Sequence, residues 1–149
     1  MPLQYQIDTS QSLIYLTATD PLTFTDWQAT LDAVLADPCF TPGFAFLSDR
    51  RQVFNDKSME DLPKMAGYLR LHARQLGPCR WAVVVPVDAK VAHGWAVVAS
   101  ELVDGSTEIE PAVFTDVDAA VAWATKTEYR IQKTEYRIQK TEDRIRKTE

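Results

Sequence analysis

The run RWAVVVP at Arg80–Pro86 constrains the fold of this chain more than any other stretch. It is apolar without interruption from Trp81 to Val85 and rich in β-branched valine, as expected of a strand that is buried on both faces. Such a strand needs an apolar layer on each side of its sheet, and helices usually supply those layers. The run therefore predicts an α/β protein with a mainly parallel sheet.

Four further strands are expected around this one. Apolar and polar residues alternate in LQYQI and in LIYLT, which predicts a hairpin around a turn at Asp8–Ser12. Phe44–Asp49 is a compact apolar strand, and Thr107–Phe114 is the last strand. Pro111 lacks a backbone N–H, so the last strand is expected at an edge of the sheet.

Helical periodicity and capping residues predict four helices that alternate with the later strands. The first helix has Thr25 and Gln28 as a capping box, and the second is expected to stop at Gly77. The third is expected to stop at Gly105. The second helix is expected to be capped by Ser58, the third by Asp88, and the fourth by the pair Thr115 and Asp118.

Each helix has an apolar stripe at helical spacing. In chain order the four stripes are Trp27, Leu31, Val34 and Leu35; Met65, Leu69, Leu71 and Leu76; Trp95, Val98 and Leu102; and Val117, Val121 and Trp123.

Strands that alternate with helices imply right-handed crossovers and parallel strands. The expected fold is a five-stranded, mainly parallel sheet with one antiparallel strand from the N-terminal hairpin and four helices. Residues 1–125 form this domain, and residues 126–149 form a C-terminal helical extension with a heptad repeat.

Charge and composition narrow the class of partner. Residues 1–125 contain 8 Lys/Arg and 16 Asp/Glu, and an acidic body argues against nucleic-acid binding. No apolar run is long enough to span a membrane, and the N-terminus has no basic segment followed by an apolar one, so a cytoplasmic location is expected. Cys39 and Cys79 are expected to be reduced, and their spacing is not that of metal ligands.

The order of elements resembles the anti-sigma-factor antagonist fold, the STAS or SpoIIAA-like superfamily, over roughly residues 3–124. The segments DPCFTPGFAFLSDRRQV (Asp37–Val53) and AVFTDVDAAVAWA (Ala112–Ala124) carry the resemblance, the latter to small bacterial members. The resemblance implies a non-enzymatic regulatory or protein-interaction module with a protein partner. Regulatory members carry a phosphorylatable serine in an Asp-Ser-Ser-Gly stretch, which matches Ser58 in NDKSMED without the second serine and the glycine. Ser58 is therefore either a phosphosite or a plain helix cap.

A second function is predicted from the carboxyl edge of the sheet, where ligands gather in open α/β folds. Polar residues follow the strands at Asp49–Arg51 and Pro86–Asp88. These residues form either a binding site for an anion or small molecule, or a solvated cluster of salt bridges. The expected edge residues are Asp49, Arg50, Arg51, Asp56 and Asp88.

Catalysis is the weakest of the three hypotheses. His72 and His93 are the only histidines, and the chain has no Gly-x-Ser-x-Gly elbow, His-Glu-x-x-His or phosphate loop. We expect no cofactor, no metal and no catalytic residue. A ligand cleft near Trp81 or Trp95 stays compatible with the sequence.

The heptad repeat KTEYRIQ in residues 126–149 favours self-association. Three isoleucines take position a, and arginine at g faces glutamate at e of a parallel partner but arginine in an antiparallel one. A parallel homo-oligomer is the first hypothesis, and a lone projecting helix, a frayed tail and a recent duplication are the alternatives. The residues concerned are Ile131, Ile138 and Ile145 in the seam, with the pairs Arg130–Glu135, Arg137–Glu142 and Arg144–Glu149.

Overall fold

The computed structural model describes residues 3–53, 58–102 and 108–126. The expected α/β architecture with a five-stranded mixed sheet is confirmed. Five helices, one more than expected, are present among the described residues, because a short helix follows the second. The elements are β1 (Leu3–Asp8), β2 (Leu13–Thr19), α1 (Phe24–Ala36), β3 (Ala45–Gln52), α2 (Ser58–Leu71), α3 (Ala73–Leu76), β4 (Cys79–Val84), α4 (Ala89–Leu102), β5 (Ile109–Phe114) and α5 (Val117–Ala124).

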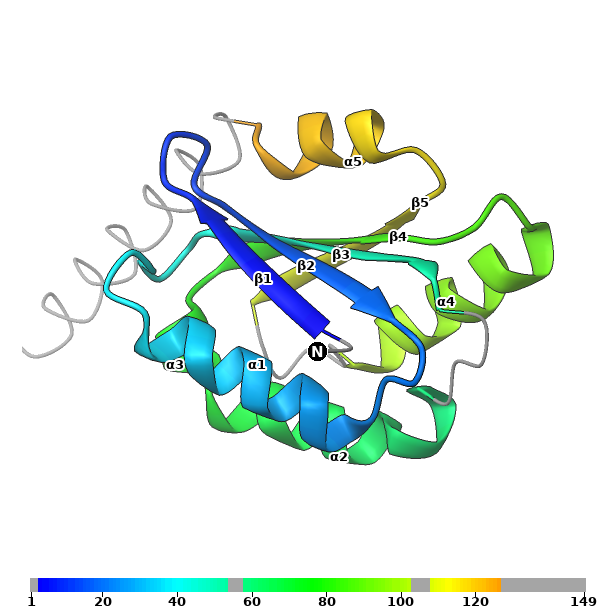
Figure 1. The fold of residues 1–149 in the computed structure, drawn as a ribbon, viewed down its shortest axis with the longest axis horizontal. Helices are drawn as coiled ribbons and strands as arrows, with labels where there is room; N and C mark the ends of the chain where they lie inside the picture. The colour runs from blue at the N-terminus through cyan, green and yellow to red at the C-terminus, as the bar shows by residue number, and fades with distance from the viewer. Residues whose placement is uncertain (1–2, 54–57, 103–107, 127–149) are drawn as a thin grey trace, which may run out of the picture.

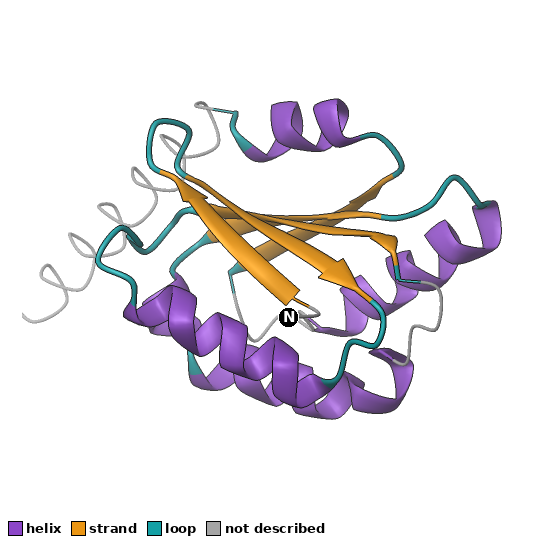
Figure 2. Ribbon diagram, in the orientation of Figure 1, coloured by secondary structure: helices purple, strands orange, loops and turns teal. Residues whose placement is uncertain are grey.

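The strands lie in sequential order, β1-β2-β3-β4-β5. β1 and β2 pair antiparallel, with Ile7 opposite Ile14, and each later strand pairs parallel with its predecessor. Crossovers of one hand between neighbouring parallel strands place their helices on the same face of the sheet. Accordingly α1, α2 and α4 cover one face and α5 covers the other (Figures 1 and 2). β5 lies at an edge, as Pro111 indicated.

Two apolar cores result, and β4 contributes to both. Trp81 and Val83 point into the larger core, between the sheet and α1, α2 and α4, whereas Ala82 and Val84 point into the smaller core under α5. β3 alternates in the same way, because successive side chains of a strand point to opposite faces. The smaller core is made of Leu13, Ala45, Leu47, Ala82, Val84, Ala120 and Ala124.

Helix boundaries correct three expectations. α1 begins at Phe24, and its capping box joins Thr23 to Asp26 rather than Thr25 to Gln28, because the first turn lies two residues earlier than expected. α5 is capped by Asp116, whose carboxylate accepts from the Ala119 N–H, rather than by Thr115. α2 ends at Leu71, which is 80% exposed and so does not belong to the apolar stripe.

The last turn of α5 is attached to the sheet by Arg80. The Nη1 of Arg80 donates a 2.6 Å hydrogen bond to the Trp123 carbonyl, and its guanidinium lies 4.8 Å from the centre of the Trp123 ring. A cation at the carboxyl end of a helix is also favoured by the helix dipole.

The expected heptad helix lies outside the described residues. Its predicted seam and pairing residues lie there too: Ile131, Ile138, Ile145, Arg130, Glu135, Arg137, Glu142, Arg144 and Glu149.

The two cysteines are free thiols in contrasting environments. Cys39 is exposed, whereas Cys79 is buried, and burial raises the pKa of the Cys79 thiol to about 12. Because thiolates are the reactive species, we expect a disulfide reagent at pH 8 to modify one thiol rapidly in the native protein and both thiols in denaturant. A Cys39→Ser variant should lose the rapid reaction. Rapid modification of that variant under native conditions would contradict the buried position of Cys79.

Candidate functional site

The polar triplet Asp49, Arg50 and Arg51 lies inside β3 rather than in a loop after it. The strand continues to Gln52 because its backbone pairs with β2 as far as Thr19. The alternation of side chains then divides the triplet between the two faces of the sheet. Asp49 and Arg51 share one face, and Arg50 points to the other. The predicted cluster of three residues is thus a pair and a separate arginine.

Asp49 and Arg51 form a two-pronged ion pair. The Nε of Arg51 donates to Oδ1 of Asp49 at 3.0 Å, and its Nη2 donates to Oδ2 at 2.8 Å. These hydrogen bonds hold the pKa of Asp49 below its ordinary value. The Arg51 side chain is 47% exposed, which matches the solvated salt-bridge interpretation for these two residues.

This ion pair is expected to contribute little to stability, and its contribution should disappear in acid. Because the pKa of Asp49 is lowered in the folded state, the pair stabilises the fold above the ordinary value of 3.8 and loses its effect as the pH falls further. A double-mutant cycle of Asp49→Asn and Arg51→Gln should give a coupling free energy of at most about 1 kcal/mol at pH 7. Urea unfolding at pH 7 and pH 3 measures this coupling. A coupling that grows as the pH falls would contradict the assigned pair.

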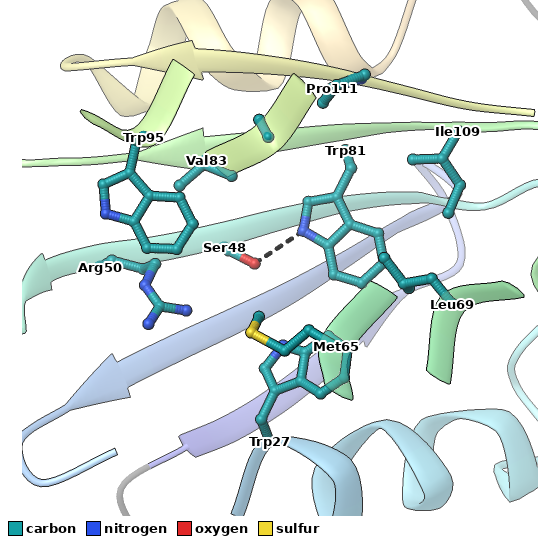
Figure 3. Close-up of a pocket in the computed structure, with 11 residues that line it drawn as sticks. Trp27, Ser48, Arg50, Met65, Leu69, Trp81, Val83, Trp95, Ile109 and Pro111 are labelled. Atoms are coloured by element: carbon teal, nitrogen blue, oxygen red, sulfur yellow. Dashed lines mark hydrogen bonds between the residues drawn. The ribbon is translucent and has the colours of Figure 1, made fainter. Parts of the chain in front are cut away.

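Arg50 lies on the helix-covered face and lines a cavity in the larger core. Its side chain is only 6% exposed, and its guanidinium lies 4.4 Å from the centre of the Trp95 ring. The cavity lies between the sheet and helices α1, α2 and α4 (Figure 3). Its lining comes from six elements: Trp27 of α1, Ser48 and Arg50 of β3, Met65 and Leu69 of α2, Trp81 and Val83 of β4, Trp95 and Ala99 of α4, and Ile109 and Pro111 of β5.

Three of the four tryptophans of the chain therefore border one cavity. Trp81 is held in a fixed orientation, because its indole Nε1 donates a 3.0 Å hydrogen bond to Ser48 Oγ and its ring stacks on Phe46 at 4.2 Å between centroids. The cavity measures about 40 Å³, enough for about three waters at 10–15 Å³ each. When the part that opens to solvent is included, the volume of the hollow is about 470 Å³.

Arg50 supplies the charged group of the described lining and Ser48 supplies its hydroxyl. Ser48 Oγ accepts the Trp81 hydrogen bond, so its hydroxyl proton points elsewhere. No carboxylate or imidazole belongs to the described lining of the cavity. Asp61 lies nearby, in a smaller hollow that Arg50 also lines, together with Thr23 and Phe24. The cavity can therefore bind and orient a guest through a cation, a hydroxyl and aromatic walls.

Among the residues that the structure describes, none of the other predicted site residues lines this cavity. Asp88 Oδ1 accepts a 2.9 Å hydrogen bond from the Lys90 N–H at the start of α4, which is the expected capping role. His72 pairs with Gln75 at 2.7 Å and lies against the Tyr68 ring, while His93 is exposed on α4. Asp56 and the side chain of Ser58 lie outside the described residues.

Within the described ranges, no helix is both long and apolar enough to cross a membrane, and no three His, Cys, Asp or Glu side chains gather as metal ligands would. Comparison of the chain with protein-family models, with curated proteins and with solved structures found no match.

Proposed function

We propose that this chain is a non-enzymatic module that binds a small molecule in the cavity between its sheet and helices α1, α2 and α4. One observation carries the proposal: Trp27, Trp81 and Trp95 converge with the buried Arg50 on a single partly open hollow. Ligand sites are typically concave and apolar, with a few polar groups that orient the guest. This arrangement has that composition.

The cost of the arrangement supports a role in binding. Protein interiors are packed with few voids larger than a water, and a buried cation costs several kcal/mol in desolvation even when it has partners. A chain that needed only a stable core would fill the space beside Trp81 and Trp95 with aliphatic side chains. Here an arginine occupies the wall instead, at 6% exposure. Such a wall has the composition of a ligand site rather than that of an aliphatic core.

A cavity-filling variant tests this proposal. Ala99 of α4 lines the cavity and is 5% exposed, so Ala99→Leu would occupy part of the space. A chemically mixed library of small molecules is screened by thermal shift against the natural chain and against this variant. We expect at least one compound class to raise Tm for the natural chain only, since a ligand at 100 times its Kd adds about 2.7 kcal/mol. Equal shifts for both proteins, or none for either, would contradict the proposal.

A STAS-like interaction module is the second candidate function. The observation in its favour is the sequential order of strands and helices. Of the two segments that carry the resemblance, Asp37–Val53 contains β3, and Ala112–Ala124 contains the end of β5 and all of α5. Under this proposal the chain acts through a protein partner, and the cavity guest would bias that contact. Co-purification of a kinase-like or sigma-regulatory partner from native cells would support it, and recovery of the bait alone would count against it.

Self-association through residues 126–149 belongs to the same proposal. The charge pattern of the repeat favours a parallel pair. Light scattering on the full chain and on a chain cut after Ala124 tests it directly. We expect a larger mass for the full chain only. If both the full chain and the truncated chain are monomers at high micromolar concentration, self-association through residues 126–149 is excluded.

A further inference from the structure

We infer that two copies of this chain join their sheets edge to edge, with β1 of one copy pairing antiparallel with β1 of the other. This inference deepens the proposed self-association and rests on it, because residues 126–149 would hold the two copies close enough for the strands to meet. It names a second contact surface, on the described body of the chain, and the register of the strands within it.

β1 is an edge strand whose outer side lacks the usual protections. It lies at one end of the sheet, and within the described residues no strand pairs with its outer side (Figure 1). Natural edge strands avoid pairing with other sheets by means of lysine, proline or a bulge. β1 reads LQYQID, without lysine or proline, and it pairs with β2 from Leu3 to Asp8 without a register shift. The opposite edge strand, β5, is protected by Pro111. β1 is therefore the edge that another strand can join.

The side chains of β1 give this edge an apolar face and a polar face. Leu3, Tyr5 and Ile7 pack on the larger core, and Tyr5 and Ile7 are only partly buried there. Gln4 and Gln6 point to the other face of the sheet and are exposed. A strand added outside β1 would bury more of the apolar rim, which favours the contact. The glutamines would then face an uncharged polar row on the new strand.

A second copy of β1 matches both faces at once. A two-fold axis perpendicular to the sheet makes the two strands antiparallel and keeps each face on its own side, so residues of the same face lie opposite one another. The inferred register pairs residues of like chemistry: Tyr5 with the partner's Tyr5, Leu3 with the partner's Ile7, and Gln4 with the partner's Gln6. Asp8, the charged residue of the strand, lies beyond these pairs.

Residues 126–149 begin at the end of the sheet where the β1–β2 hairpin turns (Figure 1). Ala124, the last residue of α5, belongs to the smaller core together with Leu13 and Ala45. Leu13 is the first residue of β2 and pairs with Asp8 at the end of β1. Two copies joined by parallel repeats would thus have their β1 edges near the point of attachment.

The strand pair is too small to hold two copies together without the repeat. Its five residues span about 17 Å, whereas stable interfaces bury about 1,200–2,000 Å² in all. A tether raises the effective concentration of the second strand to the millimolar range. We therefore expect the β1 contact in the full chain and not in a chain cut after Ala124.

Disulfide formation between engineered cysteines tests the contact in the full chain. All variants carry Cys39→Ser because Cys39 is exposed, whereas Cys79 is buried and is retained. Residues directly opposite in an antiparallel pair have Cα atoms about 4.5–5.5 Å apart, within the span of a disulfide. Gln4→Cys chains and Gln6→Cys chains are mixed and left to exchange before oxidation. In the inferred register the mixture should link about tenfold faster than either chain alone.

Thr17→Cys is the matched control for these variants. Thr17 is exposed on the same face of the sheet and pairs with Gln4, one strand in from the edge. Across the inferred contact the two copies of Thr17 lie three strand spacings apart, about 14 Å, which a disulfide cannot span. The rate of linking of this variant therefore gives the background from random collisions.

Charges at the glutamine positions test the contact without a covalent link. Gln4→Lys with Gln6→Lys puts lysines opposite each other, so we expect the full chain to dimerise about tenfold more weakly in sedimentation. Gln4→Glu with Gln6→Lys puts opposite charges across the pair in the inferred register, and this variant should dimerise at least as tightly as the natural chain. Both glutamines are exposed, so these changes should not affect folding.

The outcomes separate this inference from the proposed self-association. If the full chain is a dimer by mass but the mixed cysteine chains link no faster than Thr17→Cys, the β1 contact is overturned and self-association stands. If the full chain is a monomer, self-association is excluded and the β1 contact is excluded with it. If Gln6→Cys alone links fastest, the inferred register is wrong, because Gln6 then lies opposite the partner's Gln6.

Discussion

Replacing Phe46 with alanine is expected to lower the free energy of unfolding by about 3–5 kcal/mol. The ring is fully buried near the start of β3 and stacks almost parallel on Trp81, at 4.2 Å and 9°. Removing it takes away the transferred apolar area and leaves a void beside the existing cavity. Because a domain of this size is stable by only about 5–15 kcal/mol, the variant should be near the limit of folding at room temperature. Urea unfolding followed by circular dichroism measures the change.

Two companion variants separate the position from the residue type. Phe24→Ala removes the same ring from the half-buried first position of α1 and should cost less than about 2 kcal/mol. Phe46→Leu retains most of the buried volume and should cost about 1–2 kcal/mol. A Phe46→Ala variant that is no less stable than Phe24→Ala would show that the stack on Trp81 is not central to the core. Its tryptophan emission would then also resemble that of the natural chain.

The fold could be predicted from the sequence because its strongest signals are long and agree with one another. The uninterrupted apolar run at Arg80–Pro86 demanded two covering layers, and β4 does contribute to both cores. The alternation of period-two and helical segments then left few topologies, since crossovers are right-handed and neighbours in sequence tend to pair. Pro111 indicated the edge strand correctly.

Boundaries at the ends of elements were harder to predict, because tertiary pairing decides them. The polar run after Ser48 resembles a loop, yet backbone pairing with β2 carries β3 on to Gln52. The α5 side of the sheet has room for the Asp49–Arg51 ion pair, so polar residues do not end the strand there. Similarly, Leu71 matched a helical stripe but lies where α2 stops and the chain turns, and it is exposed.

The candidate site could be predicted only in part. Trp81 and Trp95 were recognised as possible walls of a cleft, but Trp27, Ser48 and Met65 come from other elements, and their convergence requires the packed fold. A usable signal for Arg50 existed. It follows Phe46 by four positions in the same strand, and residues i and i+4 point to the same face. Once β3 is extended through Arg50, its guanidinium must face the larger core rather than the solvated edge.

An aspartate in place of Ala120 is expected to destabilise the fold by more than about 4 kcal/mol, whereas an aspartate in place of Ala122 should cost only about 1 kcal/mol. Both alanines belong to α5, but Ala120 is fully buried and Ala122 is exposed. Ala120 packs against Leu13, Leu47 and Val84 in the smaller core, where a carboxylate would find no water.

The pairing of these variants isolates burial. The low helix propensity of aspartate acts at both sites and cancels in the comparison, whereas the helix dipole disfavours a carboxylate only in the last turn, at Ala122, and so works against the expected difference. Urea unfolding at pH 7 measures both variants, and Ala120→Leu adds a purely steric test, with an expected cost of about 1–3 kcal/mol. Equal stability of the two aspartate variants would mean that α5 does not pack on the sheet. The assignment of Arg50 and of Asp49 to opposite, separately covered faces would then lose its structural basis, because the small core beneath α5 is what distinguishes them.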